Sequence, residues 1–151
     1  KMEETTTETF EDKLEKVKSI IKFYPDFPKK GVNFLDYFSI LYRPAETRIL
    51  HELVIEKIEK FYEGKEDKFN AVVGLESRGF FLGLVISQHF NIPFVPIRKK
   101  GKLPGECICK TYGTEYSEDA VEIQKGSVDT SSRVIIVDDL LATGGTLKVA
   151  C

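Results

Sequence analysis

The sequence predicts an α/β fold with a central, mainly parallel sheet flanked by helices, and three observations support this prediction. Two short runs of mostly apolar residues, Phe69–Leu75 and Val134–Val137, are typical of strands buried on both faces of such a sheet. A third short strand, Ile92–Ile97, follows an apolar segment of helical length, Phe80–Phe90. This alternation of strand, helix and strand is characteristic of βαβ units, which build parallel sheets.

Composition narrows the class of protein. The chain has 151 residues, about one domain, with 42% hydrophobic and 30% charged residues, as in soluble globular proteins. A net charge of -2 gives no reason to expect nucleic acid as a partner, and no apolar run approaches the length of a membrane span. The three cysteines lack the spacing of a zinc site or a disulfide framework, so we expect a reducing, cytoplasmic setting.

The first forty residues are predicted to form one helix and one irregular segment. Apolar residues recur every three to four positions over Glu11–Tyr24, which predicts an amphipathic helix that ends before Pro25. The aromatic-rich stretch Phe27–Leu41 is interpreted as an irregular extended segment. A second helix is expected from Pro44 to Tyr62, because proline suits the first turn of a helix.

The second half adds a basic loop and a hairpin. Arg98–Lys102 is densely basic and follows the third strand. By itself, such a run is as typical of a solvated turn as of a binding loop. Cys107–Tyr116 and Ala120–Gln124 are predicted to pair as antiparallel strands.

The stretch Arg133–Thr146 carries the strongest functional signal. Asp138 and Asp139 follow the last strand, and a loop of small residues, Ala142–Thr146, precedes a predicted helix start. Backbone N–H groups of such a loop attract phosphate, and the helix dipole adds to this attraction. Two adjacent carboxylates can accept hydrogen bonds from a vicinal diol, so the stretch predicts a site for ribose 5-phosphate. A solvated turn before a helix is the alternative, which the flanking strand and loop disfavour.

Two other nucleotide-binding patterns are excluded. Gly74 and Gly79 have the outer spacing of a P-loop, but Phe80 and Phe81 replace its lysine and hydroxyl residue. The sequence also contains no Gly-x-Gly-x-x-Gly pattern of a dinucleotide fold.

The stretch Arg133–Thr146 resembles the signature of type I phosphoribosyltransferases, which bind phosphoribosyl pyrophosphate. Three loops leave the ends of predicted strands: Glu76–Gly79, Arg98–Pro104 and Asp138–Thr146. Ligands of open α/β sheets bind at such strand ends. The expected contacts are Ala142, Thr143, Gly144, Gly145 and Thr146 for the 5-phosphate, Asp138 and Asp139 for the diol, and Arg78, Arg98 and Lys102 for the pyrophosphate. Mg²⁺ would bridge pyrophosphate and ribose oxygens while keeping several waters, so it needs few protein ligands.

Further segments are similar to the adenine phosphoribosyltransferase family. They are Asp26–Pro28, Gly31-Val32, Gly74–Phe80, Arg98–Gly105, Glu115-Tyr116 and Glu122–Lys125. The resemblance implies the transfer of phosphoribosyl to adenine in purine salvage, which yields AMP and pyrophosphate. It also implies a homodimer, a single domain with a base-pocket hood over residues 1–43 and a core over 44–151, and an antiparallel flap hairpin.

The resemblance assigns roles to individual residues. Glu115 would lie on the flap and exchange a proton with the purine as a general acid–base. Tyr116 would shield the substrates, and Val32, Asn33 and Phe34 would line the base pocket. The peptide bond between Glu76 and Ser77 would be cis.

Two departures from the family pattern leave alternatives open. Leu35 stands where the family usually has an arginine, and a leucine cannot donate a hydrogen bond to a purine. A phosphoribosyltransferase for another purine is therefore an alternative function. A non-catalytic phosphoribosyl pyrophosphate-binding regulator is a second alternative, which Glu115 and the basic loop disfavour because a regulator needs neither. The sequence stops at Cys151, whereas the family continues through further elements, so we expect a core truncated at its C-terminus.

Overall fold

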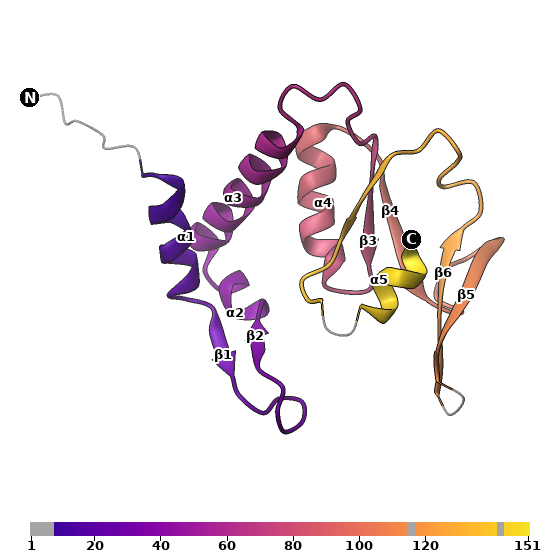
Figure 1. Cartoon of the computed structure of the whole chain (residues 1–151), viewed down its shortest axis with the longest axis horizontal. Coiled ribbons are helices and arrows are strands. Elements are labelled where there is room, and N and C mark those ends of the chain that lie inside the picture. The colour runs from indigo at the N-terminus through magenta and orange to yellow at the C-terminus, as the bar shows by residue number, and fades with distance from the viewer. Residues whose placement is uncertain (1–7, 115–116, 142–143) are drawn as a thin grey trace, which may run out of the picture. The chain divides into compact units, whose positions relative to one another are not determined.

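The computed structural model describes residues 8–114, 117–141 and 144–151, without the side chains of 112–118. These residues form two compact units, Lys1–Glu63 and Gly64–Cys151, which are considered separately (Figure 1). The single-domain organisation predicted above stays a prediction.

The N-terminal unit begins with helix α1, Phe10–Lys18, which is shorter than predicted. Thr9 caps its first turn: its hydroxyl accepts a hydrogen bond from the backbone N–H of Asp12. The helix stops at Ser19, and Lys22–Tyr24 form strand β1 instead of a last helical turn. The prediction of helix through Tyr24 was therefore wrong, because aromatic residues favour a strand where a partner strand is available.

That partner is strand β2, Phe34–Asp36, which pairs antiparallel with β1. The short helix α2, Phe38–Leu41, follows it, so the segment predicted to be irregular contains two regular elements. Helix α3 spans Pro44–Tyr62, as predicted. Val17, Ile40 and Leu53 form the buried core of this unit, joining α1, α2 and α3.

The C-terminal unit contains a five-stranded sheet with the strand order β5-β6-β4-β3-β7. The strands are β3 Ala71–Leu75, β4 Phe94–Lys99, β5 Cys107–Thr114, β6 Ser117–Gln124 and β7 Val134–Val137. β3 pairs in parallel with both β4 and β7, whereas β6 pairs antiparallel with β4 and β5. The predicted parallel centre and antiparallel hairpin are both confirmed.

Burial differs between strands β3 and β7. All five residues of β3 are buried, as predicted, because β3 has a neighbouring strand on each side and a helix over each face. β7 is an edge strand, and its first residue, Val134, is 39% exposed. The prediction that β7 is buried on both faces was therefore wrong: an apolar run does not reveal how many neighbours a strand has. β4 begins two residues later than predicted, at Phe94, after Pro93.

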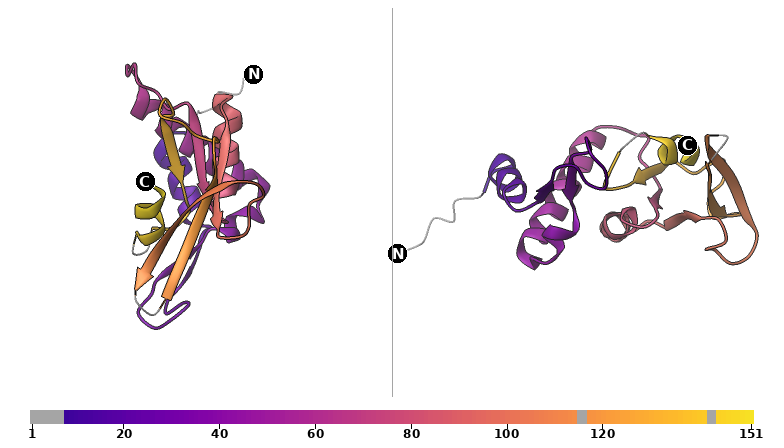
Figure 2. Two further views of the ribbon diagram at one scale, coloured as in Figure 1. Left: turned by 90° about the vertical axis from the view of Figure 1, so that its right-hand side faces the viewer. Right: turned by 90° about the horizontal axis from the view of Figure 1, so that it is seen from below.

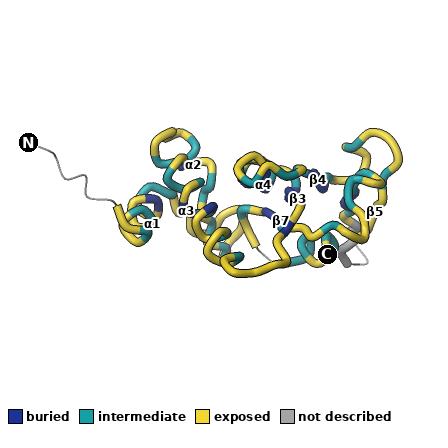
Figure 3. Tube along the Cα trace, turned by 90° about the horizontal axis from the view of Figure 1, so that it is seen from above, coloured by how far each residue is buried: buried dark blue, intermediate teal, exposed yellow. Residues whose placement is uncertain are grey.

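Two helices cover opposite faces of this sheet. Helix α4, Gly79–Phe90, packs against β3, β4 and β7, and helix α5, Gly145–Ala150, packs against β5 and β6 (Figures 2 and 3). Val149 and Ala150 of α5 pack on a cluster that includes Val73 and Leu75, while Gly83 of α4 lies against Val72. Alternate residues of β3 thus face different helices. Within the described ranges, no helix combines the length and the apolar composition needed to cross a membrane.

Candidate active site at the ends of β3 and β7

The start of helix α4 lies directly against the end of strand β7. Gly79, the first residue of α4, has no room for a side chain, because a Cβ there would collide with the carbonyl oxygen of Val137. This close approach places Arg78, which precedes the helix, beside the two aspartates that follow β7. The peptide bond before this turn, between Glu76 and Ser77, is cis, as the family resemblance implied.

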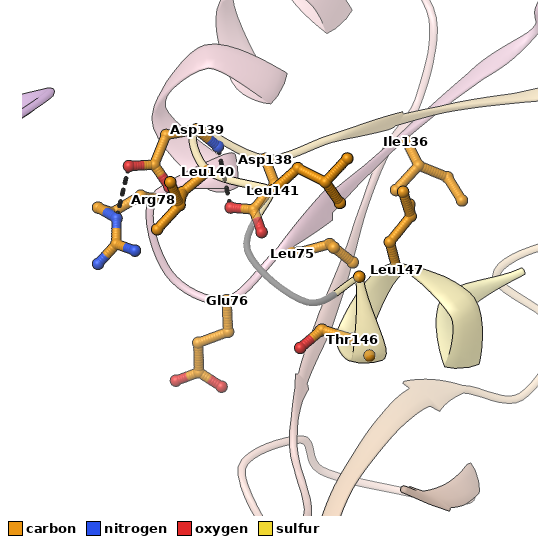
Figure 4. A pocket seen from close by; sticks show the side chains of 12 residues that line it. Leu75, Glu76, Arg78, Ile136, Asp138, Asp139, Leu140, Leu141, Thr146 and Leu147 are labelled. Carbon is orange, nitrogen blue, oxygen red and sulfur yellow. Dashed lines mark hydrogen bonds and ion pairs between the residues drawn. The ribbon is translucent and has the colours of Figure 1, made fainter. Parts of the chain in front are cut away.

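Arg78 and Asp139 form an ion pair across this junction. Arg78 Nε donates to Asp139 Oδ2 at 2.6 Å (Figure 4). The Asp139 side chain is only 4% exposed and that of Arg78 is 35% exposed. The second oxygen of Asp139, Oδ1, is buried and has no hydrogen-bond partner among the described residues. Arg78, expected at the pyrophosphate, and Asp139, expected at the ribose diol, therefore bind each other in the structure.

Asp138 has a different environment. Its Oδ1 accepts a hydrogen bond from the backbone N–H of Asp139 at 3.0 Å (Figure 4). Partial burial raises the pKa of Asp138, and the negative charge of Asp139 raises it further, while this hydrogen bond opposes the rise. Asp138 is therefore a weaker acid than an ordinary aspartic acid.

A cavity of about 540 Å³ lies at this junction. It is bounded by the end of β3, the segment after β7 and the start of α5. Its lining residues are Leu75, Glu76, Arg78, Ile136, Asp138, Asp139, Leu140, Leu141, Gly144, Gly145, Thr146 and Leu147 (Figure 4). Both aspartates, Arg78 and the described part of the phosphate loop thus meet around one space, as their positions at the strand ends predicted.

Arg98 and Lys102 do not line this cavity. One Nη atom of Arg98 donates to Glu76 Oε1 at 2.8 Å, and the other donates to the carbonyl oxygen of Lys102 at 2.9 Å. The backbone N–H of Lys99 donates to the second oxygen of Glu76 at 2.7 Å. Burial opposes the ionisation of Glu76, but the hydrogen bonds from Arg98 and Lys99 outweigh it and lower its pKa. Glu76 therefore joins the cavity to the basic loop.

Sequence reasoning gave no role to Glu76 or to a second carboxylate, Glu122. Glu122 is 7% exposed and accepts hydrogen bonds from the backbone of the basic loop. No sequence signal could have found Glu122: it lies between apolar Val121 and Ile123 in a predicted strand, and this alternation is typical of a charged residue that faces solvent.

Four predicted site residues lie outside the described residues: Glu115, Tyr116, Ala142 and Thr143. Of the remaining phosphate-loop residues, Gly144 precedes α5 with φ of +77°, and Gly145 and Thr146 begin the helix.

The residues predicted for the base pocket belong to the N-terminal unit. The Phe34 ring meets that of Phe27 edge to face, with the ring centroids 5.2 Å apart. The carbonyl oxygen of Val32 accepts a hydrogen bond from Phe27 N–H at 3.1 Å. Val32 and Asn33 belong to the segment that leads into β2, and Phe34 is the first residue of that strand.

Known proteins are similar to this chain in both sequence and fold. Residues 37–151 match the phosphoribosyl transferase domain family. The adenine phosphoribosyltransferase of Drosophila pseudoobscura pseudoobscura is 42% identical over 140 residues, which cover 93% of this chain and 75% of the relative. The chain belongs to the adenine phosphoribosyltransferase family.

Solved structures of adenine phosphoribosyltransferases agree with this assignment. The Saccharomyces cerevisiae protein, in complex with adenine and an imino-altritol bisphosphate, matches with a TM-score of 0.84 and 40% identity, over 93% of this chain and 78% of that one. The Trypanosoma brucei protein, in complex with AMP, pyrophosphate and ribose-5-phosphate, matches with a TM-score of 0.77 and 31% identity, over 91% and 59%. The predicted type I phosphoribosyltransferase fold is thus confirmed.

Proposed function

We propose that this chain transfers phosphoribosyl from phosphoribosyl pyrophosphate to adenine, forming AMP and pyrophosphate in purine salvage. One observation carries the proposal: the cavity at the ends of β3 and β7 combines a carboxylate pair, an arginine and the start of a helix. A substrate with a diol between two phosphate groups needs this combination. The family membership supports the same reaction.

In this proposal the 5-phosphate binds the phosphate loop and the start of α5, where Thr146 adds a hydroxyl group. Asp138 accepts hydrogen bonds from the ribose diol. Arg78 gives up part of its ion pair with Asp139 and donates hydrogen bonds to the pyrophosphate. The negative charge of the pyrophosphate grows as the bond to C1 of the ribose breaks. Glu115 exchanges a proton with the purine.

We assign Mg²⁺ to the same cavity. Asp138 lines the cavity and Asp139 has a buried oxygen without a partner, and carboxylate oxygens are ligands that Mg²⁺ prefers. Within the part of the chain that the structure describes, no three acidic, histidine or cysteine side chains cluster as a metal site. This donor set suits an ion that is bound chiefly by substrate oxygens and water. When bound, Mg²⁺ would neutralise charge on the leaving pyrophosphate.

An assay of three bases tests the reaction. The chain, phosphoribosyl pyrophosphate and Mg²⁺ are incubated with adenine, hypoxanthine or guanine, and nucleotide and pyrophosphate are quantified. We expect AMP and pyrophosphate in equal amounts when the base is adenine, and no product with the other two bases. Pyrophosphate release with another base would contradict the choice of adenine. Substrate binding without release under any condition would contradict catalysis and favour a regulatory role.

Leu35 is the observation that favours another purine. It lies on β2, 59% exposed, and offers no donor to a purine nitrogen. If adenine is the substrate, Leu35→Arg should leave adenine preferred over hypoxanthine and guanine. If the preferred base of the natural chain is another purine, the variant should shift the ratio of kcat/KM values towards adenine.

We further propose a cytoplasmic homodimer. The three cysteines are free thiols, which supports a reducing compartment, and the family resemblance supports the dimer. One chain has a mass of 17.2 kDa, and sedimentation equilibrium of the purified chain should give twice this mass.

A further inference from the structure

The basic loop between β4 and β5 is anchored by one buried carboxylate. Glu122 lies near the end of β6, opposite Arg98 of β4 in the register of the sheet. Its side chain is buried, with only 7% of the residue exposed. Burying a carboxylate is costly unless hydrogen bonds or opposite charges compensate, so its contacts identify its role.

These contacts are backbone amides of the loop. Glu122 Oε1 accepts hydrogen bonds from the N–H groups of Lys102 and Leu103, both at 2.8 Å. Amides of Gly101, Leu103 and Lys102 lower the pKa of Glu122 against the effect of burial, so the ionised form suits this position. Gly101 makes the reversal of the chain possible, since its φ of +79° is one that other residues rarely adopt.

The peptide unit between Lys102 and Leu103 is held from both sides. Its carbonyl oxygen accepts a hydrogen bond from Arg98 Nη1 at 2.9 Å, and its N–H donates to Glu122. Arg98 is in turn held by Glu76, which lines the cavity. A continuous set of hydrogen bonds therefore runs from Glu122 through the loop backbone and Arg98 to the edge of the cavity.

We propose that Glu122 is a positioning residue for pyrophosphate: it holds the loop so that Arg98 and Lys102 are presented to that group in one arrangement. The inference rests on the proposed function, since it takes pyrophosphate as the ligand of this loop. Four cations lie within five residues here, Arg98, Lys99, Lys100 and Lys102, and they repel one another in the absence of an anion. The carboxylate of Glu122 offsets this repulsion and fixes the conformation of the loop. Less conformational entropy of the loop is therefore lost when pyrophosphate binds.

The test compares Glu122→Gln with Glu106→Gln. In Glu122→Gln, the carbonyl oxygen of the new amide side chain can still accept hydrogen bonds but carries no charge. Glu106 lies in the same region, where it makes an exposed ion pair with Lys125, and serves as a control for the loss of one negative charge. Steady-state kinetics give kcat and the KM of each substrate, and calorimetry gives the affinity for inorganic pyrophosphate with Mg²⁺.

For Glu122→Gln we expect about a tenfold increase in the KM of phosphoribosyl pyrophosphate and a similar loss of pyrophosphate affinity, as for one weakened charge-assisted contact. The KM of the base should stay unchanged, and Glu106→Gln should match the natural chain. Glu122→Asp, which keeps the charge but shortens the side chain, should recover part of the affinity.

Several results would overturn the inference. Unchanged pyrophosphate affinity in Glu122→Gln is one of them. A parallel loss of melting temperature, kcat and affinity for both substrates, or failure of both Glu122 variants to fold, would assign Glu122 a structural role only. If the natural chain consumes no phosphoribosyl pyrophosphate in the base assay, the proposed function fails instead, and that result is obtained without any Glu122 variant.

Discussion

At the scale of single residues, the ion pair between Arg78 and Asp139 is expected to stabilise the fold. Arg78→Ala would leave the Asp139 carboxylate buried, charged and without its partner. We expect the free energy of unfolding, measured by urea denaturation, to fall by about 2–3 kcal/mol. This loss is smaller than for a fully buried ion pair, because the Arg78 side chain is partly exposed.

A double variant separates the lost interaction from the unpaired charge. Arg78→Ala with Asp139→Asn removes the buried charge as well, so it should be more stable than Arg78→Ala alone. Equal stabilities would show that the orphaned carboxylate costs nothing and would contradict this account.

The raised pKa of Asp138 predicts a pH-dependent stability with a definite sign. Because the folded state raises this pKa above the ordinary value of 3.8, protonated Asp138 favours folding and ionised Asp138 opposes it. Asp138→Asn should therefore stabilise the fold at pH 7, and the gain should shrink as the pH falls towards 3.8. Urea denaturation between pH 4 and 7 measures this difference; a gain that grows on acidification would contradict the prediction.

At the scale of elements, the fit between α4 and β7 depends on Gly79. In Gly79→Ala the new methyl group meets the backbone of Val137, which cannot rotate away as a side chain can. We expect a loss of about 1–3 kcal/mol in unfolding free energy, and a lower kcat/KM because Arg78 and the aspartates move apart. Gln88→Ala, an exposed change on the same helix, should leave both quantities unchanged.

Helices and strands were predicted correctly where local sequence determines them and missed where they depend on strand pairing. β3 was predicted well because its apolar run matches its complete burial, and α3 because Pro44 marks its first turn. α4 was predicted from the length of its apolar segment, although Phe81 and Leu84 on it are exposed. The end of α1 and the edge position of β7 were missed, since both depend on strand pairing. Phe23 and Leu35, for example, face each other across β1 and β2, and no local pattern indicates that these strands pair.

At the scale of the whole molecule, substrate binding should stabilise the fold. A ligand that binds only the folded state at 100 times its Kd adds about 2.7 kcal/mol. Phosphoribosyl pyrophosphate with Mg²⁺ should therefore raise the melting temperature. Ribose 5-phosphate, which lacks the pyrophosphate, should raise it less at equal concentration. Differential scanning fluorimetry measures both shifts.

Removal of the metal completes this test. EDTA should abolish most of the shift produced by phosphoribosyl pyrophosphate and leave that of ribose 5-phosphate nearly intact. Equal shifts with and without EDTA would exclude Mg²⁺ from the binding site as proposed.

The family, the parallel sheet and the aspartate pair with its phosphate loop could all be inferred from residues that are contiguous in the chain. Hydrophobic periodicity and short motifs are local properties, so they can be recognised before the chain folds. The partners of the charged side chains could not be inferred in this way. Arg78 and Asp139 are 61 residues apart, and Glu122 reaches a loop 20 residues away. Those contacts depend on which strands become neighbours and on how closely Gly79 lets a helix approach a strand, and only the folded arrangement decides both.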